Sequence, residues 1–422
     1  MFNKIIWTLG SKLVSSVLNF LIVILTTQLL GAAGRGEISL LLIDITVIAM
    51  VSGLLGGPAL IYLTPRNDLF KLLFPATLWA LVSGLLCTTL LRVFNLIAPG
   101  QELDVFAIAL IMNLMSINNT LLTGREKIRE SNIVNMIQIV LMIAVLYFVL
   151  VILNERSLRS YLTAMYVSYG IGLLVSWIYL RRELTTFTLH GWLDVISKGL
   201  RYGFHAQSAN LLQLLNFRLS YYLLNHYFST ALVGIYSTGV SLGEAVWIIG
   251  RSSASVQYAR VSNTNDKEYS RQLTLRLSKV SFLLTLGLLI PFLIVPKDVF
   301  TWIFGHEFGD VKMVMLWLAP GVASFGLTII YGHYFSGIGK IYLNTLASAV
   351  GLVITLILGF SLIPTYGLLG AGICSSGSYL GSSVFLTWAF IRETKATTKE
   401  LLPSKADLAY FREQAALMLG NK

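Results

Sequence analysis

The chain has 422 residues, of which 55% are apolar and only 12% are charged, and its mean hydropathy is +0.74. Soluble proteins carry about 25% charged residues, so this composition excludes an ordinary water-soluble fold. The net charge of +11 is spread over many short segments, which argues against nucleic acid as a partner. Cys87 and Cys374 lie far apart in apolar runs, so the sequence predicts neither a disulfide framework nor a metal site.

Twelve apolar segments follow one another along the chain. A hydrocarbon core about 30 Å thick needs about 20 mostly apolar residues in one helix, and continuous runs such as residues 139–153 lack the alternation of a membrane β-barrel. The expected spans are residues 5–30, 38–63, 70–97, 104–123, 132–153, 160–181, 202–228, 231–258, 275–296, 313–335, 341–363 and 367–391. The predicted fold class is therefore an all-α polytopic membrane protein with twelve transmembrane helices.

The basic residues indicate the orientation. The N-terminus, the even-numbered gaps and the C-terminal tail, together with the span ends that adjoin them, hold 23 of the 31 Lys and Arg residues, and three more lie elsewhere within spans. The odd-numbered gaps hold five: Arg35, Arg156, Arg159, Lys297 and Lys312. Short loops rich in Lys and Arg remain in the cytoplasm, so both termini are expected there.

Two matched turns indicate an internal repeat. Gly36–Ser39 (GEIS) matches Gly234–Ser237 (GIYS), and Thr123–Ile128 (TGREKI) matches Ser336–Ile341 (SGIGKI). The first two turns lie 198 residues apart and the second two lie 213 residues apart. The larger separation of the second pair indicates an insertion in the second half, which we place in the ninth gap, residues 296–310. Six spans per copy give both copies one orientation, so we expect two six-helix lobes related by a pseudo-two-fold axis along the membrane normal, as in many secondary transporters. Chance similarity between glycine-rich loops is the alternative.

The repeat implies four segments. Residues 1–183 form an N-terminal six-helix lobe, and residues 201–392 form a C-terminal one. Residues 184–200 join them as a cytoplasmic connector, either an interfacial helix or a plain loop. Residues 393–422 form a cytoplasmic tail, with a short amphipathic helix possible after Pro403.

Few ionisable residues fall within the spans, where each costs about 2.5–3.5 kcal/mol and marks a candidate functional site. Asp44 lies in the second span, His205 and Arg218 in the seventh, and Glu244 and Arg251 in the eighth. The helical rise places Arg218 and Glu244 within roughly 5 Å of each other in depth. Arg218 is either clamped by Glu244 or faces a wet cavity, and Arg251 either reaches the inner interface or faces the same cavity.

The first helix of each predicted lobe carries a polar stripe. Asn19 lies on the stripe of the first span, and Gln213 and Asn216 lie with His205 on that of the seventh. Such stripes face protein or water rather than lipid, so they serve either interhelical hydrogen bonds or a cavity lining. The sequence contains no nucleotide-binding, metalloprotease or paired-carboxylate motif, so we expect a non-enzyme without a cofactor, with a proton or sodium gradient as a candidate energy source.

Three passages resemble one family. They are Leu30–Glu37 (LGAAGRGE), residues 214–262 (LLNFRLSYYLLNHYFSTALVGIYSTGVSLGEAVWIIGRSSASVQYARVS) and Ile363–Gly372 (IPTYGLLGAG). Over nearly its whole length the chain resembles the Wzx-type bacterial polysaccharide flippases of the multidrug/oligosaccharidyl-lipid/polysaccharide exporter (MOP) superfamily. In that family an Arg in the seventh span is typically followed two residues later by Asp. Here Ser220 follows Arg218, so the resemblance does not support proton coupling at this position.

The resemblance implies transport of an undecaprenyl-diphosphate-linked oligosaccharide across the bacterial inner membrane for surface polysaccharide synthesis, such as O-antigen, by two lobes that rock around a cationic cavity. Membrane lipids, a polysaccharide polymerase and a chain-length regulator are the implied partners. Arg218, Arg251, Asn19, His205, Gln213 and Asn216 are the candidate substrate-binding residues, and Asp44 and Glu244 the candidate coupling or charge-pairing ones. A cation-coupled multidrug exporter of the same fold, or a non-transporting scaffold of a polysaccharide assembly complex, is the alternative.

The distribution of basic residues predicts the accessibility of individual loops. Single cysteines at Gln101, Asn154 and Asp310 should react with a membrane-impermeant thiol reagent from the periplasm, and those at Lys127 and Asp266 only from the cytoplasm. Reversed accessibility at two or more of these sites would contradict the topology.

Overall fold

The computed structural model describes residues 2–184 and 192–402, and its regular elements within these ranges are all helices. The first half contains α1 (Phe2–Gly56), α2 (Pro58–Leu63), η1 (Thr64–Arg66), α3 (Leu69–Val93), α4 (Glu102–Gly124), α5 (Ile128–Tyr147), η2 (Phe148–Ile152) and α6 (Leu158–Leu180). The second contains α7 (Trp192–Tyr227), α8 (Thr230–Val246), α9 (Ile248–Ser262), α10 (Lys267–Ile294), α11 (Lys297–Phe304), η3 (His306–Phe308), α12 (Val311–Gly337), α13 (Tyr342–Tyr366), α14 (Leu368–Thr394) and α15 (Thr398–Leu401).

Helical structure occupies every one of the twelve ranges expected to span the membrane. Among the described residues, eight helices are long and apolar enough to cross a bilayer, and the bent pair α8–α9 makes a ninth. One of the eight, Val14–Ile61, has 48 residues and is interrupted at Gly31. Its two parts together contain roughly 70 Å of helix, enough for two crossings of a 30 Å core. The remaining expected spans, α7 and α14, are rich in polar residues.

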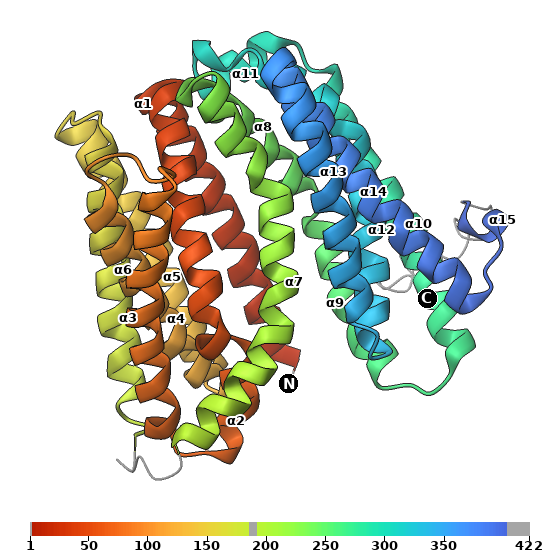
Figure 1. The fold of residues 1–422 in the computed structure, drawn as a ribbon, viewed down its shortest axis with the longest axis horizontal. Coiled ribbons are helices and arrows are strands. Elements are labelled where there is room, and N and C mark those ends of the chain that lie inside the picture. The colour runs from red at the N-terminus through yellow and green to blue at the C-terminus, as the bar shows by residue number, and fades with distance from the viewer. Residues whose placement is uncertain (1, 185–191, 403–422) are drawn as a thin grey trace. The chain divides into compact units, whose positions relative to one another are not determined.

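The chain forms two compact units. Unit 1 comprises residues 1–214, 224–237 and 300–309, and unit 2 comprises residues 215–223, 238–299 and 310–422. In unit 1, α1 packs against α3, α4 and α5, and α4 packs against α6 (Figure 1). In unit 2, α12 packs against α9, α10 and α14, and α14 also packs against α13. The lobe boundaries expected at residues 183 and 201 remain a prediction.

The connector merges with the seventh helix. α7 begins at Trp192 and continues to Tyr227, so the part of the connector that the structure describes forms the first turns of this helix. Residues 185–191 of the connector and residues 403–422 of the tail, which include the amphipathic segment expected after Pro403, lie outside the described residues.

The first pair of matched turns, residues 36–39 and 234–237, lie in contact in unit 1. A Cβ added to Gly36 would lie 1.9 Å from the carbonyl oxygen of Thr230, and one added to Gly234 would lie 1.9 Å from that of Ala32. The hydroxyl of Ser39 donates to that of Ser237 at 2.8 Å. Gly234 lies 198 residues after Gly36, and Thr230 lies 198 residues after Ala32, so the two glycine contacts are equivalent under exchange of the repeats. This is the reciprocal pattern of a two-fold contact. This contact, the 36/234 crossing, supports a two-fold relation between the repeats.

The inserted segment of the ninth gap caps a break in α1. Gly31 has a φ of +69° and interrupts the helix, which leaves the following N–H groups without intrahelical acceptors. The carboxylate of Glu307 accepts from the N–H of Ala32 at 2.5 Å, and Gln28 Nε2 donates to the carbonyl of Ile303 at 2.8 Å. Phe304, 1% exposed, anchors this segment. Glu307, 275 positions after Ala32 in the sequence, therefore caps the part of α1 that follows Gly31.

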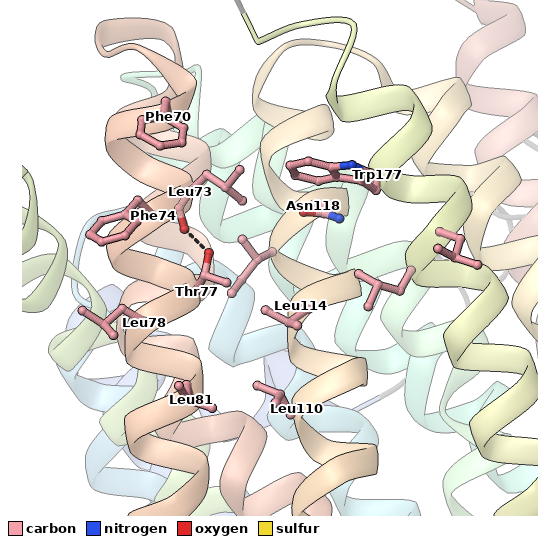
Figure 2. Close-up of a pocket in the computed structure, with 13 residues that line it drawn as sticks. Phe70, Leu73, Phe74, Thr77, Leu78, Leu81, Leu110, Leu114, Asn118 and Trp177 are labelled. Atoms are coloured by element: carbon pink, nitrogen blue, oxygen red, sulfur yellow. Dashed lines mark hydrogen bonds between the residues drawn. The ribbon is translucent and has the colours of Figure 1, made fainter. Parts of the chain in front are cut away.

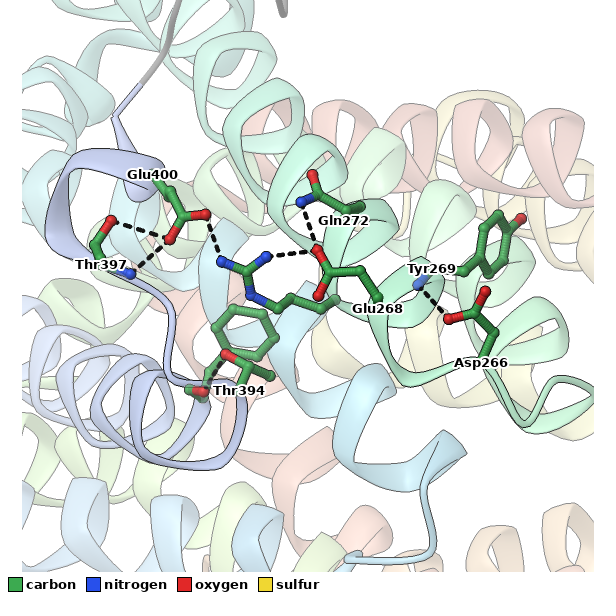
Figure 3. Close-up of polar contacts among 9 residues, drawn as sticks. Asp266, Glu268, Tyr269, Gln272, Thr394, Thr397 and Glu400 are labelled. Atoms are coloured by element: carbon green, nitrogen blue, oxygen red, sulfur yellow. Dashed lines mark hydrogen bonds and ion pairs between the residues drawn. The ribbon is translucent and has the colours of Figure 1, made fainter.

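A polar cluster holds α15 against α10 (Figure 3). Arg271 pairs with Glu268 at 2.7 Å and also with Glu400. The N–H of Thr397 donates to Glu400 at 2.7 Å. This backbone bond, followed by Arg271, lowers the pKa of Glu400 to about 2, so the carboxylate remains charged at physiological pH and fixes the described start of the tail.

The 36/234 crossing predicts that one glycine is far more sensitive than another. Gly234→Ala should destabilise the protein by about 1–3 kcal/mol because its methyl group meets backbone. Gly170→Ala on α6 is the matched control, because a Cβ there has nothing within 4 Å, and should be neutral or stabilising by up to about 1 kcal/mol. Thermal unfolding in detergent measures both, and equal midpoints would contradict the close contact.

Candidate functional site

A bidentate ion pair between Arg218 and Glu244 forms the centre of the site in unit 2. Arg218 lies on α7 and Glu244 near the end of α8, and their Nη1–Oε1 and Nη2–Oε2 distances are 2.8 and 3.0 Å. Arg218 Nη1 also donates to the hydroxyl of Tyr221 at 2.9 Å, because residues three apart share a helix face. The two charged side chains are 25% and 23% exposed. The pairing of Arg218 with Glu244, which their similar predicted depths allowed, is thus present in the structure. Substrate binding by Arg218 remains a prediction.

An aromatic cluster supports this pair. Trp247 lies where α8 and α9 meet at a bend of 44°, and its indole N–H donates to the carbonyl of Val322 at 2.9 Å. Its ring packs against Phe325 and Phe217, with centroids 4.5 and 6.0 Å away, and Phe217 packs against Tyr379 at 4.9 Å. Trp247 is fully buried. The bend is therefore fixed by packing, which holds the residues on either side of it.

Arg251 lies one turn beyond the bend. Its guanidinium carbon is 5.8 Å from the centre of the Trp247 ring, within range of a cation–π interaction. The side chain is exposed, and it makes no ion pair with another described residue. Arg251 is thus a more accessible cation than Arg218, whose charge Glu244 offsets.

Asn216 forms hydrogen bonds within unit 2. It is 2% exposed, and its Oδ1 accepts from Thr355 on α13 at 2.7 Å and from Ser378 on α14. Ser220, one turn further along α7, is also fully buried. In this conformation Asn216 therefore joins three helices, which is the interhelical interpretation of the polar stripe.

The other candidates lie in unit 1. Asn19 on α1 is exposed, and Gln213 on α7 is partly buried. Asp44 is 3% exposed, in a stretch of α1 with the buried Ile43 and Ile45. His205 lies on α7, but its side chain is outside the described part of the chain.

Some side chains lie where sequence reasoning did not place them. Arg35, expected in an exposed loop, lies on α1 and is 6% exposed, because the helix resumes directly after Gly31. Tyr221, Tyr236 and Trp247 are 3% exposed or less, so these aromatic side chains pack inside the protein in this conformation. The i, i+3 spacing was the available signal for the contact between Tyr221 and Arg218, whereas nothing local indicated the cap by Glu307.

Solved structures share this fold. An inward-facing multidrug resistance MATE family transporter of the MOP superfamily aligns with a TM-score of 0.70 at 15% identity, over 91% of this chain and 96% of its own. The lipid II flippase MurJ, in an inward closed conformation, aligns with 0.72 at 12% identity, over 99% and 93%. A MATE transporter of Vibrio cholerae aligns with 0.57 at 14% identity, over 94% and 95%.

No protein-family model and no curated protein matches the sequence. The structural likeness therefore defines the fold, which this chain shares with these MATE transporters and with the MurJ flippase. The fold covers nearly the whole chain.

The ion pair predicts a specific pattern of stability. Arg218→Ala leaves Glu244 largely buried without its partner and should cost up to about 3 kcal/mol, and adding Glu244→Gln should recover most of this loss. Arg92→Ala is the control, because Arg92 is 71% exposed in its 3.5 Å pair with Glu102, and should cost about 1 kcal/mol or less. Thermal unfolding in detergent measures all three, and an equally unstable double variant would contradict the clamp.

Proposed function

We propose that the protein is a flippase that moves an undecaprenyl-diphosphate-linked oligosaccharide from the cytoplasmic to the periplasmic leaflet of a bacterial inner membrane. The charge on the two arginines of unit 2 is the observation that carries this proposal. The lipid-linked sugar has an anionic head that hydrocarbon cannot solvate. A guanidinium group matches phosphate with two parallel hydrogen bonds.

The accessibility of the two arginines suggests an order of contacts. Arg251 is exposed and lies nearer the cytoplasm in the predicted topology, so it meets the diphosphate first. Arg218 then exchanges one carboxylate oxygen of Glu244 for a phosphate oxygen, while Tyr221 holds the guanidinium in place. Glu244 keeps Arg218 compensated when no substrate is present, which lowers the cost of holding a charge at this depth.

The repeat supports an alternating-access mechanism for this transport. In this mechanism two six-helix lobes rock around a cavity, and the 36/234 crossing lies at the predicted periplasmic end of the spans. The break at Gly31, with its positive φ, provides a hinge within α1. A proton or sodium gradient is the proposed energy source, and a polymerase and a chain-length regulator are the proposed partners for the exported glycan.

A multidrug exporter is the second candidate, because two of the three structures described above are MATE transporters. Organic cations would require acidic groups in the cavity, but the first and seventh spans contain no Asp or Glu. Asp44 is buried, and Glu244 is paired with Arg218. The charge balance therefore favours an anionic substrate.

Glycan export in a deletion strain tests the proposal. Arg251→Ala should reduce export about tenfold or more, because each lost hydrogen-bonded charge costs about 1.5–3 kcal/mol, and Arg251→Lys should retain part of the activity. Arg218→Ala should reduce export similarly after normalisation to folded protein, and Arg92→Ala should have little effect. Normal export by both alanine variants would reject the anion-binding role, and drug efflux without glycan export would favour the exporter.

A further inference from the structure

An apolar groove of about 620 Å³ lies between α3, α4 and α6 of unit 1 (Figure 2). α4 packs against both of the other helices and provides the floor, with Leu110, Leu114 and Ile117 spaced four and three residues apart. The walls are the exposed or partly exposed side chains of the two outer helices. They include Phe74, Leu78, Leu81, Leu174 and Trp177.

The side chains that line the groove are mostly apolar and favour a hydrocarbon ligand. Leu174 is 63% exposed and Trp177 is 45% exposed, so much of the groove wall is available to an occupant. Asn118 is the buried polar residue of the lining, and its Nδ2 already donates to Ser176 at 3.0 Å. The groove therefore suits a flexible apolar chain, and its volume is within the usual range for small-ligand sites.

The length of the groove matches one leaflet. Its lining on α3 runs from Phe70 to Leu81, eleven residues apart, which correspond to roughly 17 Å of helix. Half of a 30 Å hydrocarbon core is about 15 Å. One acyl chain of a phospholipid in a single leaflet thus fits the groove from end to end, whereas a long isoprenoid chain would extend beyond it.

The end of the groove near Phe70 and Trp177 is basic. The adjoining segments 64–71, 124–127 and 181–183 contain six basic and three acidic residues. Lys71 pairs with Asp68 at 3.5 Å, and Lys127 with Glu183 at 3.2 Å. Arg181 lies one turn beyond Trp177, and neither it nor Arg182 makes an ion pair with another described residue. These two arginines are positioned for an anionic head group, and basic residues at this membrane end indicate the cytoplasmic leaflet.

We propose that this groove is a binding site for an anionic phospholipid of the cytoplasmic leaflet. One acyl chain lies on Leu114 between α3 and α6, and the phosphate is held near Arg181 and Arg182. Basic residues at a membrane surface contribute about 1 kcal/mol each to binding of anionic lipid. The site is independent of the transported substrate, because it is built from α3, α4 and α6 and does not include Arg218 or Arg251.

Native mass spectrometry of the delipidated full-length protein tests the site by titration with dioleoyl phosphatidylglycerol and dioleoyl phosphatidylcholine. Wild type should bind phosphatidylglycerol more tightly. Arg181→Gln with Arg182→Gln should weaken phosphatidylglycerol binding about thirtyfold, since two residues at about 1 kcal/mol each are lost, and leave phosphatidylcholine binding unchanged. Arg156→Gln with Arg159→Gln is the matched control, because these exposed arginines lie just before and at the start of α6, opposite the end that carries Arg181, and it should bind like wild type.

A groove-filling variant tests the acyl-chain site. Leu114→Trp should weaken both lipids, whereas Leu90→Trp, on α3 but outside the groove and 49% exposed, should not. If Leu114→Trp does not fold, Leu174→Ser replaces it with the same expectation. Equal binding of the two lipids, or no effect of the groove variants, would overturn the proposal. Displacement of phosphatidylglycerol by an equal concentration of undecaprenyl phosphate would also overturn it and assign the groove to the carrier lipid.

Discussion

Hydrocarbon solvates neither charges nor unpaired backbone groups, and this constraint determines the arrangement of every polar residue described above. A charge within the spans needs an opposite charge or a route to water, and a helix that breaks within the protein needs a substitute acceptor for its free N–H groups. Arg218 meets the first requirement through Glu244. The break at Gly31 meets the second through Glu307.

The same constraint governs the ion pair of Arg218 and Glu244. A lone cation at this depth would destabilise the empty protein, and a pair isolated in the core would be unable to exchange partners. Here both side chains remain about one-quarter exposed, and the surrounding aromatic cluster keeps the bend of α8–α9 in place. The protein can therefore hold a positive charge near the site without the full cost of an uncompensated ion.

The fold was predictable from the sequence because span length and basic-residue position depend on bilayer thickness and on insertion, which act on each segment separately. All twelve expected ranges proved helical for this reason. The candidate site was predictable only in part. Depth along a helix is set by residue number, which sufficed for Arg218 and Glu244, but rotation about the helix axis is set by packing. Asn216 shows the difference, because its stripe indicated avoidance of lipid, whereas Thr355 and Ser378, remote in sequence, determine that it faces helices.

The cap by Glu307 makes the two repeats unequal during synthesis. The start of α8 is stabilised by residues that are close to it in sequence. The hydroxyl of Thr230 donates to the side-chain oxygen of Asn225 at 2.8 Å, and the hydroxyl of Ser229 accepts from the N–H of Leu232 at 3.4 Å. The corresponding helix start at Ala32 depends on a residue made 275 positions later, roughly 15–55 s at ordinary rates of translation. The first half of the chain therefore enters the membrane with an incomplete helix start, and the insertion in the second half completes it.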